Sequence, residues 1–128
     1  MKPNPVVWFE IHVQDMARAR KFYEAVFQCQ LETLKSPAGE ANGMQMLSFP
    51  GDMTTMGASG ALVKMEGVPS SGGGTLVYFA CEDCAVEQGR VEKAGGKVFK
   101  PKFSIGEYGQ CALVNDTEGN MIGLHSMK

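Results

Sequence analysis

The sequence predicts an α+β fold of two tandem βαβββ modules, with eight strands curved around a cleft and two helices outside. Three observations lead to this prediction. A strand pattern near the N-terminus runs directly into an amphipathic helix, the same succession starts again 68 residues later, and three short strand patterns follow each helix. Because the chain is a tandem of one unit, we expect its function to lie in whatever the two units enclose.

The first strand is expected at residues 6–13, where side chains alternate with the period of a half-buried strand. One face, expected to pack against the helix, carries Phe9, Ile11 and Val13. The other face, expected to line the cleft, carries Trp8, Glu10 and His12. The strand therefore offers a polar and aromatic surface to the concavity.

A helix is predicted from Asp15, placed as its N-cap, to Phe27. Its apolar stripe consists of Met16, Ala19, Phe22, Tyr23, Val26 and Phe27. Three short strands are expected at residues 29–35, 44–49 and 60–65, separated by Gly- and Pro-containing breakers. The first module thus covers about residues 5–67, and the Pro/Ser/Gly stretch 68–74 is interpreted as a linker.

The second module, about residues 75–128, repeats the order. A strand at 75–81 leads to a second N-cap at Asp83, and the following helix ends at Gly95 and Gly96. Strands are expected at 97–103, 110–114 and 121–126, with a turn at 116–120 joining the last pair. The whole chain, residues 1–128, is predicted to form a single domain of two modules.

Composition excludes several classes of partner. The chain has 12 Lys and Arg against 14 Asp and Glu with no run of like charge, so we expect no nucleic-acid partner and no anionic membrane surface. No apolar run approaches the length of a membrane span, and the N-terminus has no signal-peptide pattern. Four cysteines in 128 residues suit free thiols in a reducing compartment, so a cytoplasmic protein is expected.

In this order, the motifs resemble those of the vicinal oxygen chelate superfamily, which includes glyoxalase I, bleomycin-resistance proteins, fosfomycin-resistance enzymes and extradiol dioxygenases. The resemblance covers essentially the whole chain. The matching features are the helix opening D-x-A-x-A-x-x-FY-x-x-VF at residues 15–27, AGGKV at 94–98 and D-x-x-GN at 116–120. Relatives often dimerise by pairing or exchanging modules, so the resemblance also implies a homodimer.

Metal-dependent members of the superfamily place four ligands on the cleft face. The resemblance puts those positions here at Trp8, Leu62, Val77 and Gly123. None of these side chains can bind a divalent cation, because ligands must be imidazole, carboxylate or thiolate. The sequence is therefore closer to a metal-free branch, and no cofactor is expected.

Glu10, His12 and His125 are the candidate catalytic residues, because both histidines of the chain are expected to point into the cleft beside a carboxylate. Such a group could supply a general base, with the second histidine or Tyr108 as acid or hydrogen-bond donor. Two imidazoles and one carboxylate could alternatively hold a displaced metal ion. Equally, these side chains could simply be hydrogen-bonded at strand ends or solvated at the rim.

The candidate ligand-binding residues form an apolar wall with a mobile cover. They are Trp8, Leu62, Val77, Phe79 and Gly123 on the strands, and Glu107 and Tyr108 in a glycine-flanked loop. Trp8 could either fill the volume of the missing metal or stack on a ligand ring. The loop could be a flap over the cleft, although an ordinary turn with glycines at positive φ is the commoner case.

Cys81 and Cys84 form a CxxC pair, but acidic neighbours oppose a thiolate and no second pair completes a zinc site. We therefore interpret this segment as a strand-to-helix junction.

Two functions follow from these expectations. The first is a metal-independent protein of the bleomycin-resistance type that binds a small apolar or aromatic molecule. The second is a lyase or isomerase that acts on a small carbonyl compound through Glu10, His12 and His125. A module that only binds a protein partner is less favoured, because the exposed helix faces carry charged residues. Whether the protein is an enzyme stays open at this point.

Overall fold

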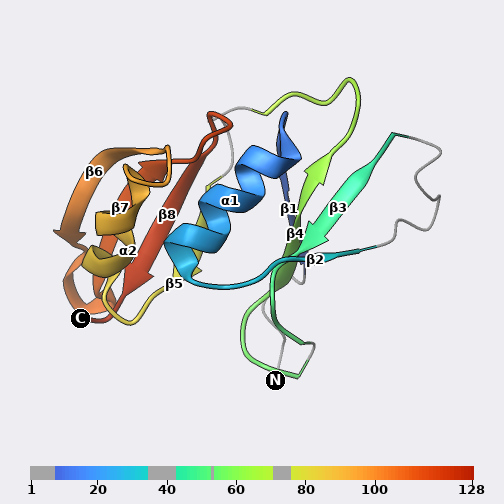
Figure 1. Cartoon of the computed structure of the whole chain (residues 1–128). Helices are drawn as coiled ribbons and strands as arrows, with labels where there is room; N and C mark the ends of the chain where they lie inside the picture. The colour runs from blue at the N-terminus through green and yellow to red at the C-terminus, as the bar shows by residue number, and fades with distance from the viewer. Residues whose placement is uncertain (1–7, 35–42, 53, 71–75) are drawn as a thin grey trace.

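The computed structural model describes residues 8–34, 43–52, 54–70 and 76–128, and it has the predicted α+β architecture of two βαβββ modules (Figure 1). The first module consists of β1 (Trp8–His12), α1 (Met16–Phe27), β2 (Glu32–Thr33), β3 (Gln45–Ser48) and β4 (Ser59–Lys64). The second consists of β5 (Val77–Ala80), α2 (Cys84–Val91), β6 (Lys97–Ser104), the short 3-10 helix η2 (Gly106–Tyr108), β7 (Gln110–Asn115) and β8 (Met121–Ser126).

Each module forms one four-stranded sheet, and the two sheets have the same topology. The strand orders are β1-β4-β3-β2 and β5-β8-β7-β6. In both sheets the first strand pairs in parallel with the last, and the other pairs are antiparallel. The matching orders confirm the repeat that the sequence predicts.

Both helices begin at the predicted aspartates. The Asp15 side chain accepts a hydrogen bond from the backbone N of Arg18 at 3.0 Å, and that of Asp83 accepts one from Ala85 N at 3.0 Å. The helix α2 ends at Val91, earlier than the glycine pair. Gly96 follows the helix, and this position requires glycine because a Cβ there would lie 2.4 Å from the carbonyl oxygen of Asn115.

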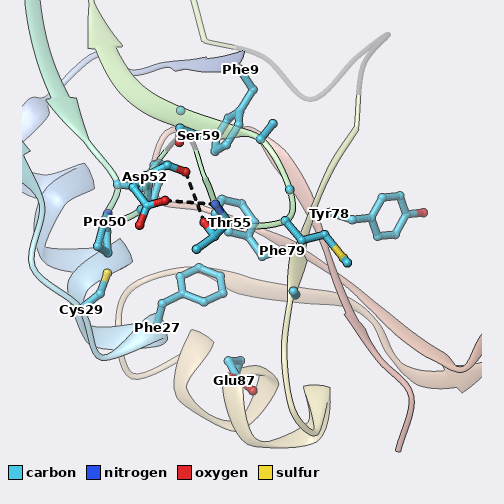
Figure 2. A pocket seen from close by; sticks show the side chains of 17 residues that line it. Phe9, Phe27, Cys29, Pro50, Asp52, Thr55, Ser59, Tyr78, Phe79 and Glu87 are labelled. Atoms are coloured by element: carbon cyan, nitrogen blue, oxygen red, sulfur yellow. Dashed lines mark hydrogen bonds between the residues drawn. The ribbon is translucent and has the colours of Figure 1, made fainter. Parts of the chain in front are cut away.

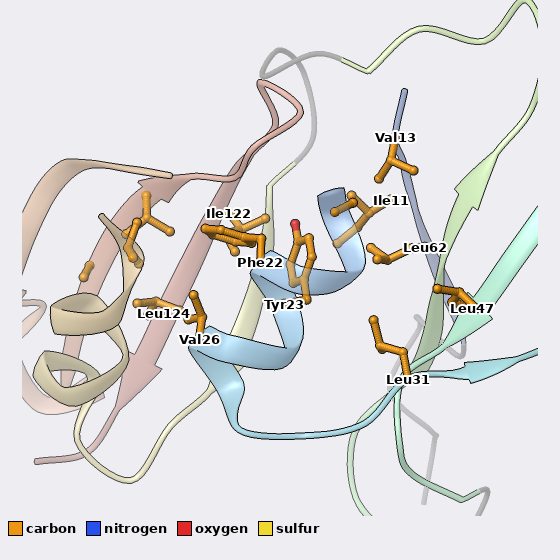
Figure 3. Close-up of a cluster of buried hydrophobic side chains, with 14 of the residues drawn as sticks. Ile11, Val13, Phe22, Tyr23, Val26, Leu31, Leu47, Leu62, Ile122 and Leu124 are labelled. Atoms are coloured by element: carbon orange, nitrogen blue, oxygen red, sulfur yellow. The ribbon is translucent and has the colours of Figure 1, made fainter. Parts of the chain in front are cut away.

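The helix α1 lies between the two sheets, which the sequence did not predict. Its buried side chains Phe22, Tyr23 and Val26 form one core with both sheets (Figure 3). The first sheet contributes Ile11, Leu47 and Leu62, and the second contributes Ala112, Ile122 and Leu124. In the described residues, the strands therefore form two sheets with α1 between them rather than one surface around a single cleft. Each sheet has an inner face toward the helices and an outer face away from them.

The turn between β7 and β8 fixes the second module to the start of α1. Oε1 of Glu118 accepts hydrogen bonds from the backbone N atoms of Gln14 and Asp15, both at 2.9 Å, and Oε2 accepts one from Arg18 Nε at 2.7 Å. Burial would raise the pKa of Glu118, but these hydrogen bonds outweigh it and lower the pKa to about 2. The Tyr23 hydroxyl donates to Asp116 Oδ2 at 2.7 Å beside this contact.

Two smaller expectations are only partly tested. The second strand is short, at Glu32–Thr33, against the expected 29–35. Of the expected linker, Val68 to Ser70 belong to the described part, and residues 71–74 lie outside it. Within the described ranges, no helix is long and apolar enough to cross a membrane.

Candidate functional site

The outer face of the second sheet contains a pocket of about 420 Å³. Strands β5, β6, β7 and β8 contribute its walls, and the residue before η2 closes one end. The lining residues are Tyr78, Phe79, Ala80, Phe103, Ile105, Cys111 and His125. We call this cavity the outer pocket. It is mainly apolar and contains one imidazole, a combination typical of small-molecule sites.

Among the predicted site residues, this pocket is lined by Phe79 of β5 and by His125. Strand alternation turns His125 to the outer face, because its neighbours Leu124 and Ser126 are buried on the inner face. Its Nε2 lies 2.8 Å from the carbonyl oxygen of Tyr108. Because a carbonyl can only accept, Nε2 carries the proton, and in the neutral ring Nδ1 is the free acceptor.

The loop that carries Glu107 and Tyr108 is a closed turn beside His125. The Ile105 N donates to Gly109 O at 2.9 Å, and Gly109 adopts a φ of 109°. A Cβ at Gly109 would lie 2.4 Å from the carbonyl oxygen of Ser126, so this position requires glycine. Both side chains of the loop are exposed, and its role as a mobile flap stays a prediction.

Tyr78 covers Gly123 on the outer face of the second sheet. The two residues are register partners on β5 and β8. A Cβ added to Gly123 would lie 2.3 Å from Tyr78 Cδ1. The tyrosine ring therefore occupies the space that a side chain at position 123 would need. Tyr78 is not among the predicted site residues, although the 68-residue repeat aligns it with Glu10 of the first module.

The outer face of the first sheet carries the other predicted polar residues. Trp8 Nε1 donates to Glu10 Oε2 at 3.1 Å, and the Trp8 side chain remains 39% exposed. His12 is half-buried, and its Nδ1 is buried without a hydrogen-bond partner among the described residues. These three side chains share one surface, as predicted from strand alternation.

Leu62 and Val77, predicted as wall residues, lie on the inner faces instead, and Phe79 packs on α1 while it also lines the outer pocket. Leu62 pairs with Ile11 in the register of β1 and β4 and is fully buried in the core. Val77 pairs with the core residue Ile122, so it too faces inward. The ring of Phe79 stacks on Phe27 of α1 at 4.6 Å between centroids. An error of one residue in the predicted phase of a strand turns every side chain of that strand to the opposite face, which explains why these assignments differ from the prediction.

The structure does not bring Glu10 and His12 together with His125 in one chain. His12 belongs to β1 of the first sheet and His125 to β8 of the second, and among the described residues these side chains and Glu10 do not gather in one group. The expectation that both histidines of one chain share one concavity is therefore wrong.

A metal ion does not fit the positions that the superfamily pattern implies. Trp8, Leu62, Val77 and Gly123 have no suitable donor, and two of them face inward. Among the residues described, no three His, Cys, Asp or Glu side chains gather in a way that could hold a metal ion. The alternative set of Glu10, His12 and His125 is divided between the two sheets.

The CxxC pair has no reactive thiol. Cys84 is fully buried at the first turn of α2. Burial, together with the charge of Glu87, raises the pKa of Cys81 to about 12. Cys111 lies in the outer pocket, and burial raises the pKa of its thiol also. The thiols of Cys81 and Cys111 therefore act as small apolar groups at neutral pH.

Known proteins are similar to this chain over most of its length, and one family model matches a shorter N-terminal segment. The model of the bleomycin resistance protein-like N-terminal family matches residues 6–27. A glyoxylase-like domain-containing protein of Didymella fabae is 31% identical over 112 residues, which are 87% of this chain and 84% of that protein. CFP32 of Mycobacterium tuberculosis, whose name includes the word glyoxylase, is 26% identical over 91% of this chain.

The chain spans 43% of the length of CFP32. Among solved structures, TnmS3, an antibiotic binding protein from Streptomyces sp. CB03234, has a TM-score of 0.63 and 23% identity, with 98% of both chains covered. At this sequence identity, the similarity to TnmS3 shows a shared fold.

Proposed function

This chain belongs to the vicinal oxygen chelate superfamily, among its glyoxalase-like and bleomycin-resistance-like members, and on that premise we propose that it binds a small apolar or aromatic molecule without a metal ion. The observation that carries the proposal is the Tyr78 ring over Gly123, because an aromatic surface takes the space of a fourth metal ligand. The outer pocket is then a binding site rather than a metal centre.

The lining of the outer pocket suits such a ligand. Its volume of about 420 Å³ lies within the range of small-molecule sites, roughly 300–1,000 Å³. Tyr78 and Phe103 provide aromatic surface, and His125 Nδ1 provides one hydrogen-bond acceptor for orientation. That TnmS3 is an antibiotic binding protein with a similar fold supports this class of function.

We further propose that a second copy of the chain completes the site. The outer face of the first sheet carries Trp8, Glu10 and His12, with Trp8 partly exposed. In a homodimer, this face of one protomer would cover the outer pocket of its partner. The arrangement would bring the tryptophan wall and the second histidine to the ligand from the other chain.

A metal analysis tests the proposal. Protein purified without a histidine tag is expected to contain no stoichiometric metal, and Zn²⁺, Ni²⁺, Mn²⁺ and Fe²⁺ are expected to give no specific rise in melting temperature. A stoichiometric metal, or a stabilisation that disappears in His12→Ala or His125→Ala, would contradict metal independence.

The fixed tautomer of His125 favours one alternative function. Its free Nδ1 in an apolar pocket could act as a general base in a lyase or isomerase that acts on a small carbonyl compound. Turnover of such a compound that is abolished by His125→Ala would support this enzyme. Turnover unaffected by both His125→Ala and His12→Ala would rule out the acid–base role.

A further inference from the structure

A second pocket, which we call the inter-module pocket, lies between the two modules and has a volume of about 430 Å³. The loop between β3 and β4, the end of α1, the strand β5 and the helix α2 all contribute to it (Figure 2). It differs from the outer pocket because phenylalanines of the inner faces form its floor. The two pockets share only Tyr78, Phe79 and Ala80 of β5.

Four phenylalanines line the inter-module pocket and contact one another: Phe9, Phe27, Phe49 and Phe79. Phe27 and Phe79 stack at 4.6 Å between centroids, and Phe9 meets Phe79 edge-on at 5.9 Å. Because each ring is fixed by its neighbours, the floor is rigid and offers aromatic surface to a ligand. Figure 2 shows that Phe9, Phe27 and Phe79 come from three different elements, while Tyr78 points away from them.

The charged side chains of the lining are both acidic: Asp52 and Glu87. Hydrogen bonds from Thr54 and Thr55 lower the pKa of Asp52, so its carboxylate is ionised at neutral pH. Oε1 of Glu87 is buried and receives no hydrogen bond within the described ranges, although the carboxylate is close enough to the Cys81 thiol to raise the pKa of that thiol. A buried carboxylate oxygen without a partner is costly, and a ligand that donates a hydrogen bond or carries positive charge would satisfy it.

In the part of the chain that the structure describes, no Lys or Arg side chain lines this pocket. Arg90 of α2 directs Nη1 to the carbonyl oxygen of Val26 at 2.9 Å. Lys102 pairs with Asp83 at 2.9 Å, at the start of α2. Neither basic residue belongs to the lining. The acidic charge of the pocket therefore stays available to a ligand.

From this lining we infer that the inter-module pocket binds a small organic cation, an amine or quaternary ammonium ion with an apolar or aromatic body. The phenylalanine floor takes the apolar body and attracts the cation through the ring faces. Glu87 pairs with the positive charge inside the pocket, and Asp52 attracts it at the mouth. This site is additional to the outer pocket, with which it shares Tyr78, Phe79 and Ala80 of β5.

The inference can be tested with benzyltrimethylammonium as the probe. Backbone amide NMR of labelled protein follows the titration, with benzyl alcohol as a neutral control and benzenesulfonate as an anionic control. We expect saturable shifts at Thr55, Ser59 and Glu87 with the cation, weaker binding of the alcohol and none of the sulfonate. Shifts confined to Cys111 and His125 would place the probe in the outer pocket and overturn the inference.

A pair of matched variants tests the role of the carboxylate. Glu87→Gln removes the charge inside the pocket and should raise the Kd of the cation by about tenfold. Glu92→Gln makes the same change at an exposed position at the end of α2 and should leave the Kd unchanged. Asp52→Asn, in an exposed loop, should raise the Kd of the cation by roughly threefold. This variant keeps the inference testable if Glu87→Gln does not fold. Equal Kd values for all folded variants, or no saturable binding to the unmodified protein, would refute the inference.

Discussion

Glu118→Gln tests the contact that fixes the two modules to each other. In the folded protein the pKa of Glu118 falls from its ordinary value of 4.5 to about 2, because hydrogen bonds from Arg18 and from the backbone of Asp15 and Gln14 outweigh burial. Each unit of pKa corresponds to about 1.4 kcal/mol, so the shift corresponds to about 3 kcal/mol. The Arg18 side chain is half-exposed, and solvent screening reduces the expected contribution to about 2 kcal/mol.

The sign of the pH dependence follows from the lowered pKa. Glu118 contributes its full stabilisation above the pKa of the unfolded chain, near 4.5, and loses it as the pH falls through the folded value of about 2. Urea unfolding measured at several pH values between these limits should show this loss in the unmodified protein. Glu118→Gln should lower the free energy of unfolding at pH 7 by about 2 kcal/mol and make the slope between these pH values smaller.

Glu92→Gln provides the control, because Glu92 is exposed and its change should stay within about 0.5 kcal/mol. If Glu118→Gln kept both the neutral-pH stability and the acid slope of the unmodified protein, the proposed role of this contact would be refuted.

Three glycine substitutions give further predictions, each measured by urea or thermal unfolding. Gly60→Ala should destabilise by about 2–3 kcal/mol, since its Cβ would lie 2.3 Å from the packed ring of Phe9; an unchanged stability would contradict that packing. Gly89→Ala should stabilise the protein by about 0.5–1 kcal/mol, because a Cβ added at this exposed position of α2 would have no atom within 4 Å and alanine favours the helix. A loss of stability would contradict a helical, unobstructed position 89. Gly123→Ala should cost about 1 kcal/mol and displace the half-exposed Tyr78 ring, which a tyrosine fluorescence or NMR shift would report; no shift would refute the close approach.

The sequence predicted the repeat, because cap residues, apolar periodicity and glycine exits are local signals. Asp15 and Asp83 mark both helix starts, and the alternation on β1 assigns Trp8, Glu10 and His12 to one face as the structure has them. These signals act over a few residues and need no knowledge of packing.

The register of β4 and β5 was not predictable in the same way. Ala61, Leu62 and Val63 are all buried, so the apolar run has no alternation that would assign faces. The segment from Val77 to Phe79 is also apolar throughout. For β4 no polar residue marks the solvent side, so the phase of this strand cannot be read from the sequence. For β5 the 68-residue repeat, which aligns Tyr78 with Glu10, is the one signal that assigns Val77 and Phe79 to the inner face.

The position of α1 between the sheets depends on contacts between the modules. One signal for it exists in the sequence, since the apolar stripe from Met16 to Phe27 is wide enough to pack on two surfaces. The inter-module pocket has no comparable signal. Its floor comes from three elements and a loop, and only the assembled fold brings Phe27, Phe49 and Phe79 together.

The central claim, metal-independent binding of a small apolar or aromatic molecule in the outer pocket, is tested most directly by titrating labelled protein with indole in the presence of EDTA. The account predicts saturable amide shifts at Phe103, Cys111 and His125 under these conditions, and loss of these shifts when Tyr78 is changed to Ala. Shifts at these residues that appear only after a divalent cation is added, or that are absent with and without the cation, would contradict it.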